Sequence, residues 1–127
     1  MTLLRSAIFF AGGVLVTALF GLLVPPAGLV SVRAAQWLAR EWARWILRWA
    51  QLACGIDYTV EGAEHIPAGP AIIMAKHQSA WETIFLEATF PYQCWIVKRE
   101  LLWLPFVGWG LVALRAIAID RKSGQAA

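Results

Sequence analysis

The strongest constraint on this chain is a run of 27 positions without a charged residue, from Ser6 to Val32. The apolar part before the two prolines, Ala7–Val24, has 18 residues, and as a helix it would be about 27 Å long. That length is close to the roughly 30 Å of the hydrocarbon core of a bilayer. Pro25 and Pro26 are expected to break or sharply bend the helix. We therefore predict that residues 1–32 form a hydrophobic membrane segment.

Three arrangements of this segment are open. It can span the membrane, enter one leaflet as a hairpin that returns at the prolines, or serve as a cleaved secretory signal. The signal is the least favoured, because only Arg5 marks a basic start and no Ala-x-Ala site follows the apolar run. If the helix spans, one arginine precedes it and four follow, so the C-terminal side should be cytoplasmic.

Residues 33–54 are predicted to form an amphipathic helix. At 100° per residue, one face is basic and polar, and the opposite face is rich in tryptophan. The polar face carries Arg33, Gln36, Arg40, Arg44, Arg48 and Gln51; the apolar face carries Leu38, Trp42, Trp45, Ile46, Trp49 and Leu52, and Trp37 is an exception on the polar side. Such a pattern is typical of a helix in the headgroup layer, where each arginine adds about 1 kcal/mol of binding. The alternative is a helix packed on the domain core with its arginines in solvent.

The composition agrees with a membrane-associated protein. Sixty per cent of the chain is hydrophobic and 15% is charged, against roughly 25% charged in an average soluble domain. Eight tryptophans favour a boundary between water and an apolar phase. No basic run with interleaved aromatic residues follows residue 50, so nucleic acid is not an expected partner. Cys54 and Cys94 fit no metal-ligand spacing, and we expect reduced, buried thiols and no metal.

Residues 55–127 alternate between strand and helix patterns, which predicts an α/β domain with a mixed or parallel sheet. Gly55 should end the preceding helix. The expected strands are Ile56–Val60, Ala71–Ala75, Cys94–Lys98 and Ala116–Asp120. The expected helices run from about Ala80 to Ala88, within Glu100–Pro105 and within Phe106–Leu114.

The stretch KHQSAWET places a histidine, His77, five positions before a carboxylate, Glu82, with four residues between them. On one continuous helix these side chains would point about 140° apart. Ser79-x-x-Glu82 is a capping box, however, and predicts a helix that starts after His77. His77 could then fold back towards Glu82. The plain alternative is that Glu82 only completes the cap and His77 is a polar loop residue.

Three blocks in this order, IIMAKHQSAWET, VKRELLWLPFVGWG and AIAIDR, resemble the lysophospholipid acyltransferase family, the 1-acylglycerol-3-phosphate acyltransferases. The first block matches that family's Asn-His-x4-Asp motif, and the last matches its second motif, which ends in Ile-Asp-Arg. The resemblance runs from about Tyr58 to Arg121. It implies a partial glycerolipid-acyltransferase-type α/β domain behind the membrane segment. It also implies a bacterial inner-membrane location with the catalytic domain on the cytoplasmic face.

The resemblance implies a mechanism. His77 would be the general base on the free hydroxyl of lysophosphatidic acid, which would attack the thioester of acyl-CoA or acyl carrier protein and give phosphatidic acid. Glu82 would orient the imidazole, as a carboxylate does in a serine-hydrolase triad. No covalent intermediate, metal or cofactor is implied beyond the thioester co-substrate.

The resemblance also assigns the phosphate of the acceptor to Arg121, whose guanidinium suits an anion. The alternative for Arg121 is an ion pair with Asp120. Lys98 could add positive charge at the substrate site or simply be solvated. His65, in a turn before Pro67, is expected to be a surface loop residue.

Three departures from the family pattern limit the resemblance. Glu82 replaces the usual aspartate, Lys76 replaces the asparagine before the histidine, and the family's third motif, Glu-Gly-Thr-Arg, does not occur. We therefore expect residues 55–127 to be the N-terminal portion of an acyltransferase domain, ending before the third motif, and the 127 residues alone to be inactive or nearly so.

Other functions remain open. The acceptor could be another lysolipid, such as a lyso-ornithine lipid. The chain could instead be a non-catalytic membrane-anchoring module. A hydrolase ranks low, because the sequence contains no Gly-x-Ser-x-Gly nucleophile motif.

Overall fold

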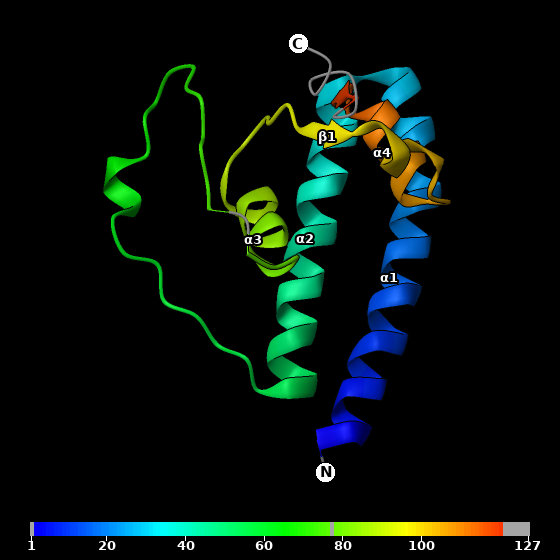
Figure 1. Ribbon diagram of the computed structural model, residues 1–127, viewed down its shortest axis with the longest axis vertical. Coiled ribbons are helices and arrows are strands. Elements are labelled where there is room, and N and C mark those ends of the chain that lie inside the picture. Colours follow the sequence, from blue (N-terminus) through cyan, green and yellow to red (C-terminus); the bar gives the residue numbers. More distant parts are fainter. Residues whose placement is uncertain (1, 77, 121–127) are drawn as a thin grey trace.

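The computed structural model describes residues 2–76 and 78–120. Its elements follow the chain in the order α1 (Thr2–Val30), α2 (Val32–Cys54), η1 (Ala63–His65), α3 (Trp81–Thr89), β1 (Ile96–Lys98), η2 (Arg99–Trp103), α4 (Val107–Ala113) and β2 (Ile117–Ile119). The two long helices, α1 and α2, lie side by side and run in opposite directions (Figure 1). Helix α3 packs on α2, and α4 packs on α1. The α/β elements are therefore built directly onto the helical hairpin.

Helix α1 continues through both prolines, so the prediction that they break it is wrong. A proline removes its own N–H donor from the helix but does not have to end it. The backbone bonds resume after the prolines, where the Ser31 N–H donates to the Ala27 carbonyl at 2.9 Å. The chain reverses at Ser31, whose backbone is extended and whose hydroxyl accepts the Arg33 N–H at 3.2 Å. Among the described residues, α1 is the helix long and apolar enough to cross a membrane, by length and composition.

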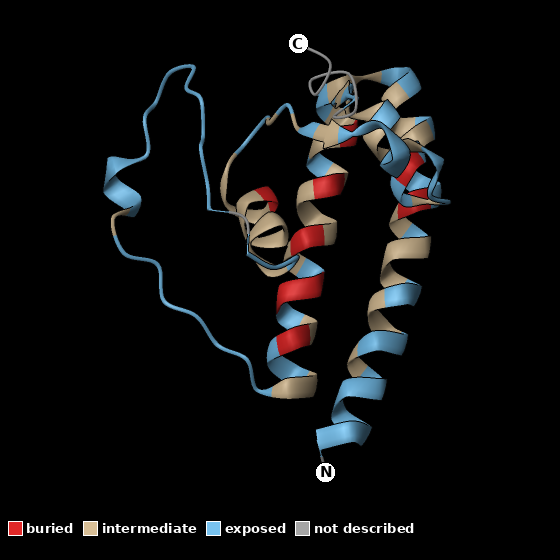
Figure 2. Cartoon of the chain, viewed as in Figure 1, coloured by how far each residue is buried: buried red, intermediate tan, exposed pale blue. Residues whose placement is uncertain are grey.

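Helix α2 matches the amphipathic helix predicted from residue 33 to residue 54, and it ends as expected at Gly55, which has φ +71°. Four of its alanines, Ala35, Ala39, Ala43 and Ala50, are buried and allow close packing (Figure 2). Two tryptophans of its apolar face contact α1 directly. Trp42 Nε1 donates to Thr17 Oγ1 at 3.1 Å, and Trp49 Nε1 donates to the Phe9 carbonyl at 3.1 Å. Trp42 and Trp49 of that face therefore lie against α1, whereas Trp45 and Leu52 of the same face are exposed.

The strands β1 and β2 form a parallel pair with Ile96 opposite Ile117 and Lys98 opposite Ile119. They lie within the predicted strands Cys94–Lys98 and Ala116–Asp120. Helices α3 and α4 confirm the predicted helices after Ala80 and Phe106, and the short helix in Glu100–Pro105 is the 3₁₀ helix η2.

The strands predicted at Ile56–Val60 and Ala71–Ala75 are wrong. Both segments lie in a long connection that loops away from the helices (Figure 1). Ile72 and Met74 are 91% and 92% exposed. A strand needs a neighbour to pair its N–H and C=O groups, and among the described residues only β1 and β2 pair with each other. An apolar run of strand length does not by itself supply that neighbour.

Two smaller predictions have mixed outcomes. Both cysteines are free thiols, but the expected burial is wrong for Cys94, which is exposed near the Arg115 carbonyl. His65 is confirmed as an exposed residue of the connection, with Nε2 3.4 Å from Glu64 Oε1.

Candidate functional site

Glu82 stands in the first turn of α3, where the capping box predicted it. Its Oε1 accepts the Ser79 N–H at 2.7 Å and also the Gln78 N–H. Its Oε2 accepts the Ser79 hydroxyl at 2.5 Å. The Ser79 oxygen in turn accepts the Trp81 N–H at 3.2 Å. The predicted contact of Glu82 with the Ser79 N–H is therefore present, but the prediction that Ser79 caps the helix is wrong, because α3 begins at Trp81 and its N-cap is Ala80.

These contacts fix the charge of Glu82. The Ser79 hydroxyl, followed by the Ser79 backbone N–H, lowers the pKa of Glu82 to about 2. The carboxylate therefore stays ionised over the whole physiological range. An ionised, immobilised carboxylate is suited to orient a neighbouring imidazole. His77 lies outside the described residues, one position before Gln78, so its predicted contact with Glu82 remains a prediction.

An aromatic cluster supports this turn of α3 from the side. Tyr58 meets Trp81 and Phe85 edge-on, each at 5.4 Å between ring centroids. Trp81 and Phe85 are stacked at 5.3 Å. Such pairs add stabilisation beyond the area they bury. The connection after Gly55 is therefore attached to the helix that carries the motif.

One of the two predicted substrate-binding residues, Lys98, lies within the described residues. Lys98 is the last residue of β1 and lies opposite Ile119 of β2. Arg121 lies outside the described residues. Its predicted phosphate contact and its alternative ion pair with Asp120 therefore both remain predictions. Lys98 is half-exposed, with Nζ 3.4 Å from Glu100 Oε1. The pKa of Glu100 is lowered, first by its own backbone N–H and further by Lys98.

Sequence reasoning missed an apolar cavity of about 230 Å³ between the helical hairpin and the α/β elements. Its walls come from α1, α2, α3, β1, η2 and α4, and include Phe20, Trp42, Val97, Leu101, Phe106 and Leu111. Thr83 and Glu87 reach it from α3, the helix that also holds Glu82. No local pattern indicates this space, because its walls are up to 97 positions apart in the chain, from Thr17 to Leu114.

Glu87 is the charged residue among the described walls of this cavity, and it is buried. Trp95 Nε1 donates to Glu87 Oε2 at 2.5 Å. Burial raises the pKa of Glu87, against the opposing effects of the Trp95 N–H and the charge of Arg40. Arg40 itself donates to the Ala88 and Thr89 carbonyls, each at 3.1 Å. The carboxyl group and the arginine thus join α2, α3 and the chain before β1.

The described part of the site is thus a hydrogen-bonded carboxylate, Glu82, next in the helix to Thr83, which lines the apolar cavity. The family model named Acyltransferase matches residues 57–127, and the chain belongs to that family. The predicted resemblance is therefore confirmed.

Curated relatives carry a more specific name. The chain is 42% identical to a 1-acyl-sn-glycerol-3-phosphate acyltransferase of Pseudomonas aeruginosa over 92 residues, which are 72% of this chain and 36% of that protein. It is 33% identical to the Saccharomyces cerevisiae protein of the same name over 94 residues, 73% of this chain and 30% of the relative. The chain thus matches about a third of the length of these relatives. No solved structure matches it significantly.

Proposed function

We propose that the protein containing these residues transfers a fatty acyl group to the free hydroxyl of 1-acylglycerol-3-phosphate and forms phosphatidic acid. The observation that carries the proposal is the ionised carboxylate of Glu82, held at the start of α3 and next in the helix to Thr83 at the apolar cavity. The names of the curated relatives support the choice of substrate.

The proposed reaction has one transfer step. His77 takes the proton from the hydroxyl of the acceptor, and the hydroxyl oxygen attacks the carbonyl carbon of acyl-CoA or acyl carrier protein. The carbon–sulfur bond breaks, and the proton passes from the imidazolium to the leaving sulfur. Glu82 orients the imidazole and stabilises its positive charge meanwhile. Arg121 would bind the phosphate of the acceptor, and Lys98 would add positive charge.

The apolar cavity suits the acyl chain of either substrate. A fatty acyl chain gains about 0.8 kcal/mol for each methylene group that it buries, and the described walls offer almost only apolar atoms. The position of Thr83 and Glu87 one helical turn apart on α3 connects this space to the helix of the motif.

We further propose that the α1–α2 hairpin lies in one leaflet. Helix α2 runs antiparallel beside α1. Trp42 of α2 contacts Thr17 of α1, and Cys54 Sγ, at the end of α2, is 3.9 Å from the Arg5 carbonyl. A spanning α1 would therefore draw the arginines of α2 into the bilayer core, at about 2.5–3.5 kcal/mol each. Thr2→Cys and Ser31→Cys, each introduced into a Cys54→Ser, Cys94→Ser background, should react with an impermeant maleimide from the same side of sealed vesicles. Labelling from opposite sides would show that α1 spans.

The function is tested by giving the purified full-length protein one acyl-CoA and a panel of acceptors. We expect product from 1-acylglycerol-3-phosphate. We expect little product from lysophosphatidylcholine, whose phosphate is esterified to the cationic choline, or from a lyso-ornithine lipid, which has no phosphate. Preference for the lyso-ornithine lipid would move the assignment to that acceptor. Absence of transfer to any acceptor, with vesicle binding intact, would favour the anchoring module.

A further inference from the structure

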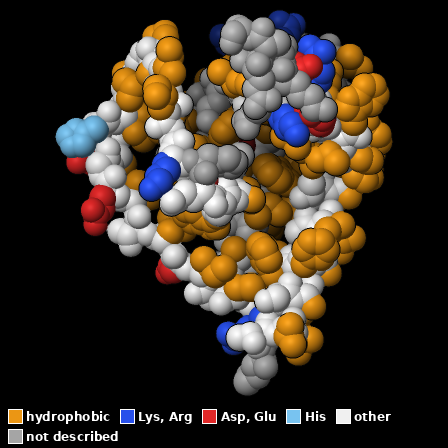
Figure 3. Space-filling model, in the orientation of Figure 1, with side chains coloured by type: hydrophobic (Ala, Val, Ile, Leu, Met, Phe, Trp, Pro, Cys, Tyr) orange, Lys and Arg blue, Asp and Glu red, His pale blue; other side chains and the backbone are white. Residues whose placement is uncertain are grey.

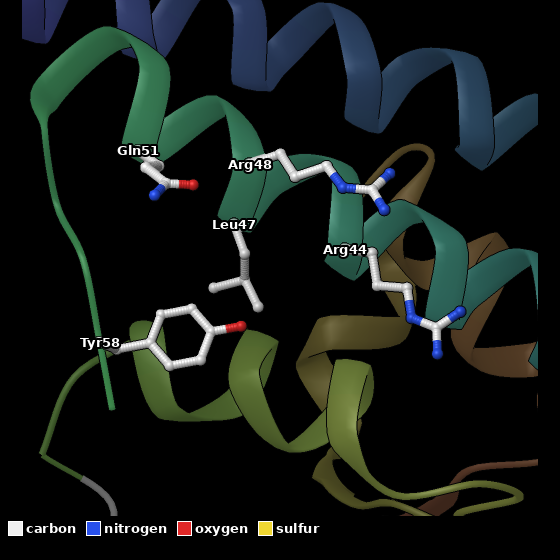
Figure 4. A pocket seen from close by; sticks show the side chains of 5 residues that line it. All are labelled: Arg44, Leu47, Arg48, Gln51 and Tyr58. Carbon is white, nitrogen blue, oxygen red and sulfur yellow. The ribbon is translucent and has the colours of Figure 1, made fainter. Parts of the chain in front are cut away.

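A second polar site lies on α2, away from the motif and the cavity. A groove of about 190 Å³ is lined by Arg44, Leu47, Arg48, Gln51 and Tyr58 (Figure 4). Arg44, Arg48 and Gln51 follow the i, i+4, i+7 spacing of one helix face. Figure 4 shows the two guanidinium groups directed the same way, with the Tyr58 ring across from Leu47. None of these residues lines the apolar cavity.

The arginines of this face differ in what they contact. The guanidinium of Arg40 donates to the carbonyls at the end of α3. Arg48 makes no ion pair with a carboxylate within the described part of the chain, and its guanidinium lies 5.8 Å from the centre of the Trp45 ring. Arg44 Nη1 donates to Glu41 Oε1 at 2.5 Å, which leaves its Nη2 and Nε for another acceptor. Arg44 and Arg48 are the charged residues among the described lining of the groove, so the lining carries positive charge.

The acidic groups nearby, Glu41 and Asp57, do not line the groove. Glu41 is bound to Arg44 alone, and Asp57 Oδ1 accepts the Tyr58 N–H at 3.0 Å. The wall formed by Tyr58 is held in place, because its ring packs on Trp81 and Phe85. Guanidinium forks, an amide and a phenol on a fixed concave surface are the donors that recognise phosphate oxygens.

The surroundings indicate where that phosphate comes from. Trp45, beneath Arg48, is 52% exposed, and arginine with tryptophan is the usual pair at the headgroup level of a membrane. Helix α1, on the other side of α2, presents a broad apolar surface (Figure 3). We propose that Arg44, Arg48, Gln51 and Tyr58 bind the phosphate of an anionic phospholipid in the membrane to which the hairpin attaches. This site is distinct from the acceptor phosphate site proposed at Arg121.

Such a lipid would hold the connection after Gly55 in place as well as bind the protein to the membrane. Tyr58 contacts the groove on one side and Trp81, next to Glu82, on the other. A bound headgroup therefore holds the connection after Gly55 against the first turn of α3. Membrane binding and the geometry of the motif are linked through this one side chain.

The test is flotation of the full-length protein with phosphatidylcholine vesicles, with and without phosphatidylglycerol, in the absence of any acyl donor. Two arginines at about 1 kcal/mol each should make R44Q/R48Q lose about 10–30-fold in apparent affinity for the anionic vesicles. The matched control R5Q/R33Q removes the same charge from exposed positions outside the groove, and should lose clearly less affinity than R44Q/R48Q, because diffuse attraction is screened by salt.

The charge-preserving variant R44K/R48K separates a site from diffuse attraction. A lysine cannot reproduce the guanidinium fork, so we expect a loss of about 5-fold or more, and Tyr58→Phe should lose about 2–5-fold. Wild-type binding by R44K/R48K, or equal losses in R44Q/R48Q and R5Q/R33Q, would overturn the proposal. Displacement of the protein from anionic vesicles by inorganic phosphate, at an ionic strength matched with chloride, would show that the groove takes free phosphate and would overturn the lipid assignment. Because no acyl donor is present, these results do not depend on the proposed acyl transfer.

Discussion

His77→Ala in the full-length protein is expected to lower the kcat of acyl transfer by about 10²–10⁴-fold, the usual contribution of a positioned general base. The change removes the group that accepts the proton of the acceptor hydroxyl, and it leaves the apolar cavity and the α1–α2 hairpin untouched. The measurement is acyl transfer to 1-acylglycerol-3-phosphate at saturating acyl-CoA, with vesicle flotation run in parallel.

The chain offers a matched control for this variant. His65 is the other histidine, and it is exposed in η1, beside Glu64. His65→Ala should therefore retain wild-type kcat. If His77→Ala also keeps most of its activity, His77 is not the base, and the reading of His77 as a polar loop residue prevails. If both variants lose activity together with vesicle binding, the loss comes from folding, and thermal unfolding of each variant will show it.

Local chemistry in the sequence predicted the parts of the structure that local chemistry controls. Gly55 ends α2 because glycine tolerates a φ of +71° at little cost. The pairing of Ser79 with Glu82 was predictable because both partners lie within one helical turn. The local strand and helix patterns were also sufficient to predict β1, α4 and β2, because each is a short element.

The remainder depends on contacts between distant residues. No residue near the prolines indicates that α1 continues to Val30. The end of α1 packs against α4, which lies far away in the sequence. The approach is close: a Cβ added at Gly28 would lie 2.8 Å from the Ala113 Cβ. The sequence does not show that Trp42 and Trp49 of α2 donate to Thr17 and Phe9 of α1, because the partners lie 25 and 40 positions away. The burial of Glu87 has no local signal in the sequence, because Trp95 and Arg40 reach it from two other segments.

Glu82 allows the sharpest choice between a catalytic and a purely structural motif. Glu82→Gln keeps the size of the side chain and an oxygen for the Ser79 N–H, but it removes the negative charge that would stabilise the imidazolium. In a histidine–carboxylate pair the corresponding amide substitution costs about 10⁴-fold in kcat, so we expect a loss of about 10²–10⁴-fold. Glu82→Asp, which installs the residue usual in the family, should retain far more activity than Glu82→Gln.

Ser79→Ala is the matched control, because it removes the hydroxyl that contributes most to the lowered pKa of Glu82 while leaving the charge in place. Loss of this hydroxyl should cost about 1 kcal/mol of stability and no more than a few-fold in kcat. If Glu82 served only the cap, Ser79→Ala and Glu82→Gln would instead show similar, small losses. That outcome would remove Glu82 from the proposed mechanism.

The pH dependence of stability gives an independent check on the charge of Glu82. Its pKa is about 2 in the folded protein against 4.5 as the reference value, so the unfolded chain binds the proton more readily than the folded one. The contribution of the carboxylate to stability is therefore complete above about pH 4.5 and is lost as the pH falls towards 2. The Tm of the wild type should drop more steeply than that of Glu82→Gln across this window. Parallel Tm curves would show that the hydrogen bonds from Ser79 and Gln78 do not hold an ionised carboxylate, and the orienting role proposed for Glu82 would lose its physical basis.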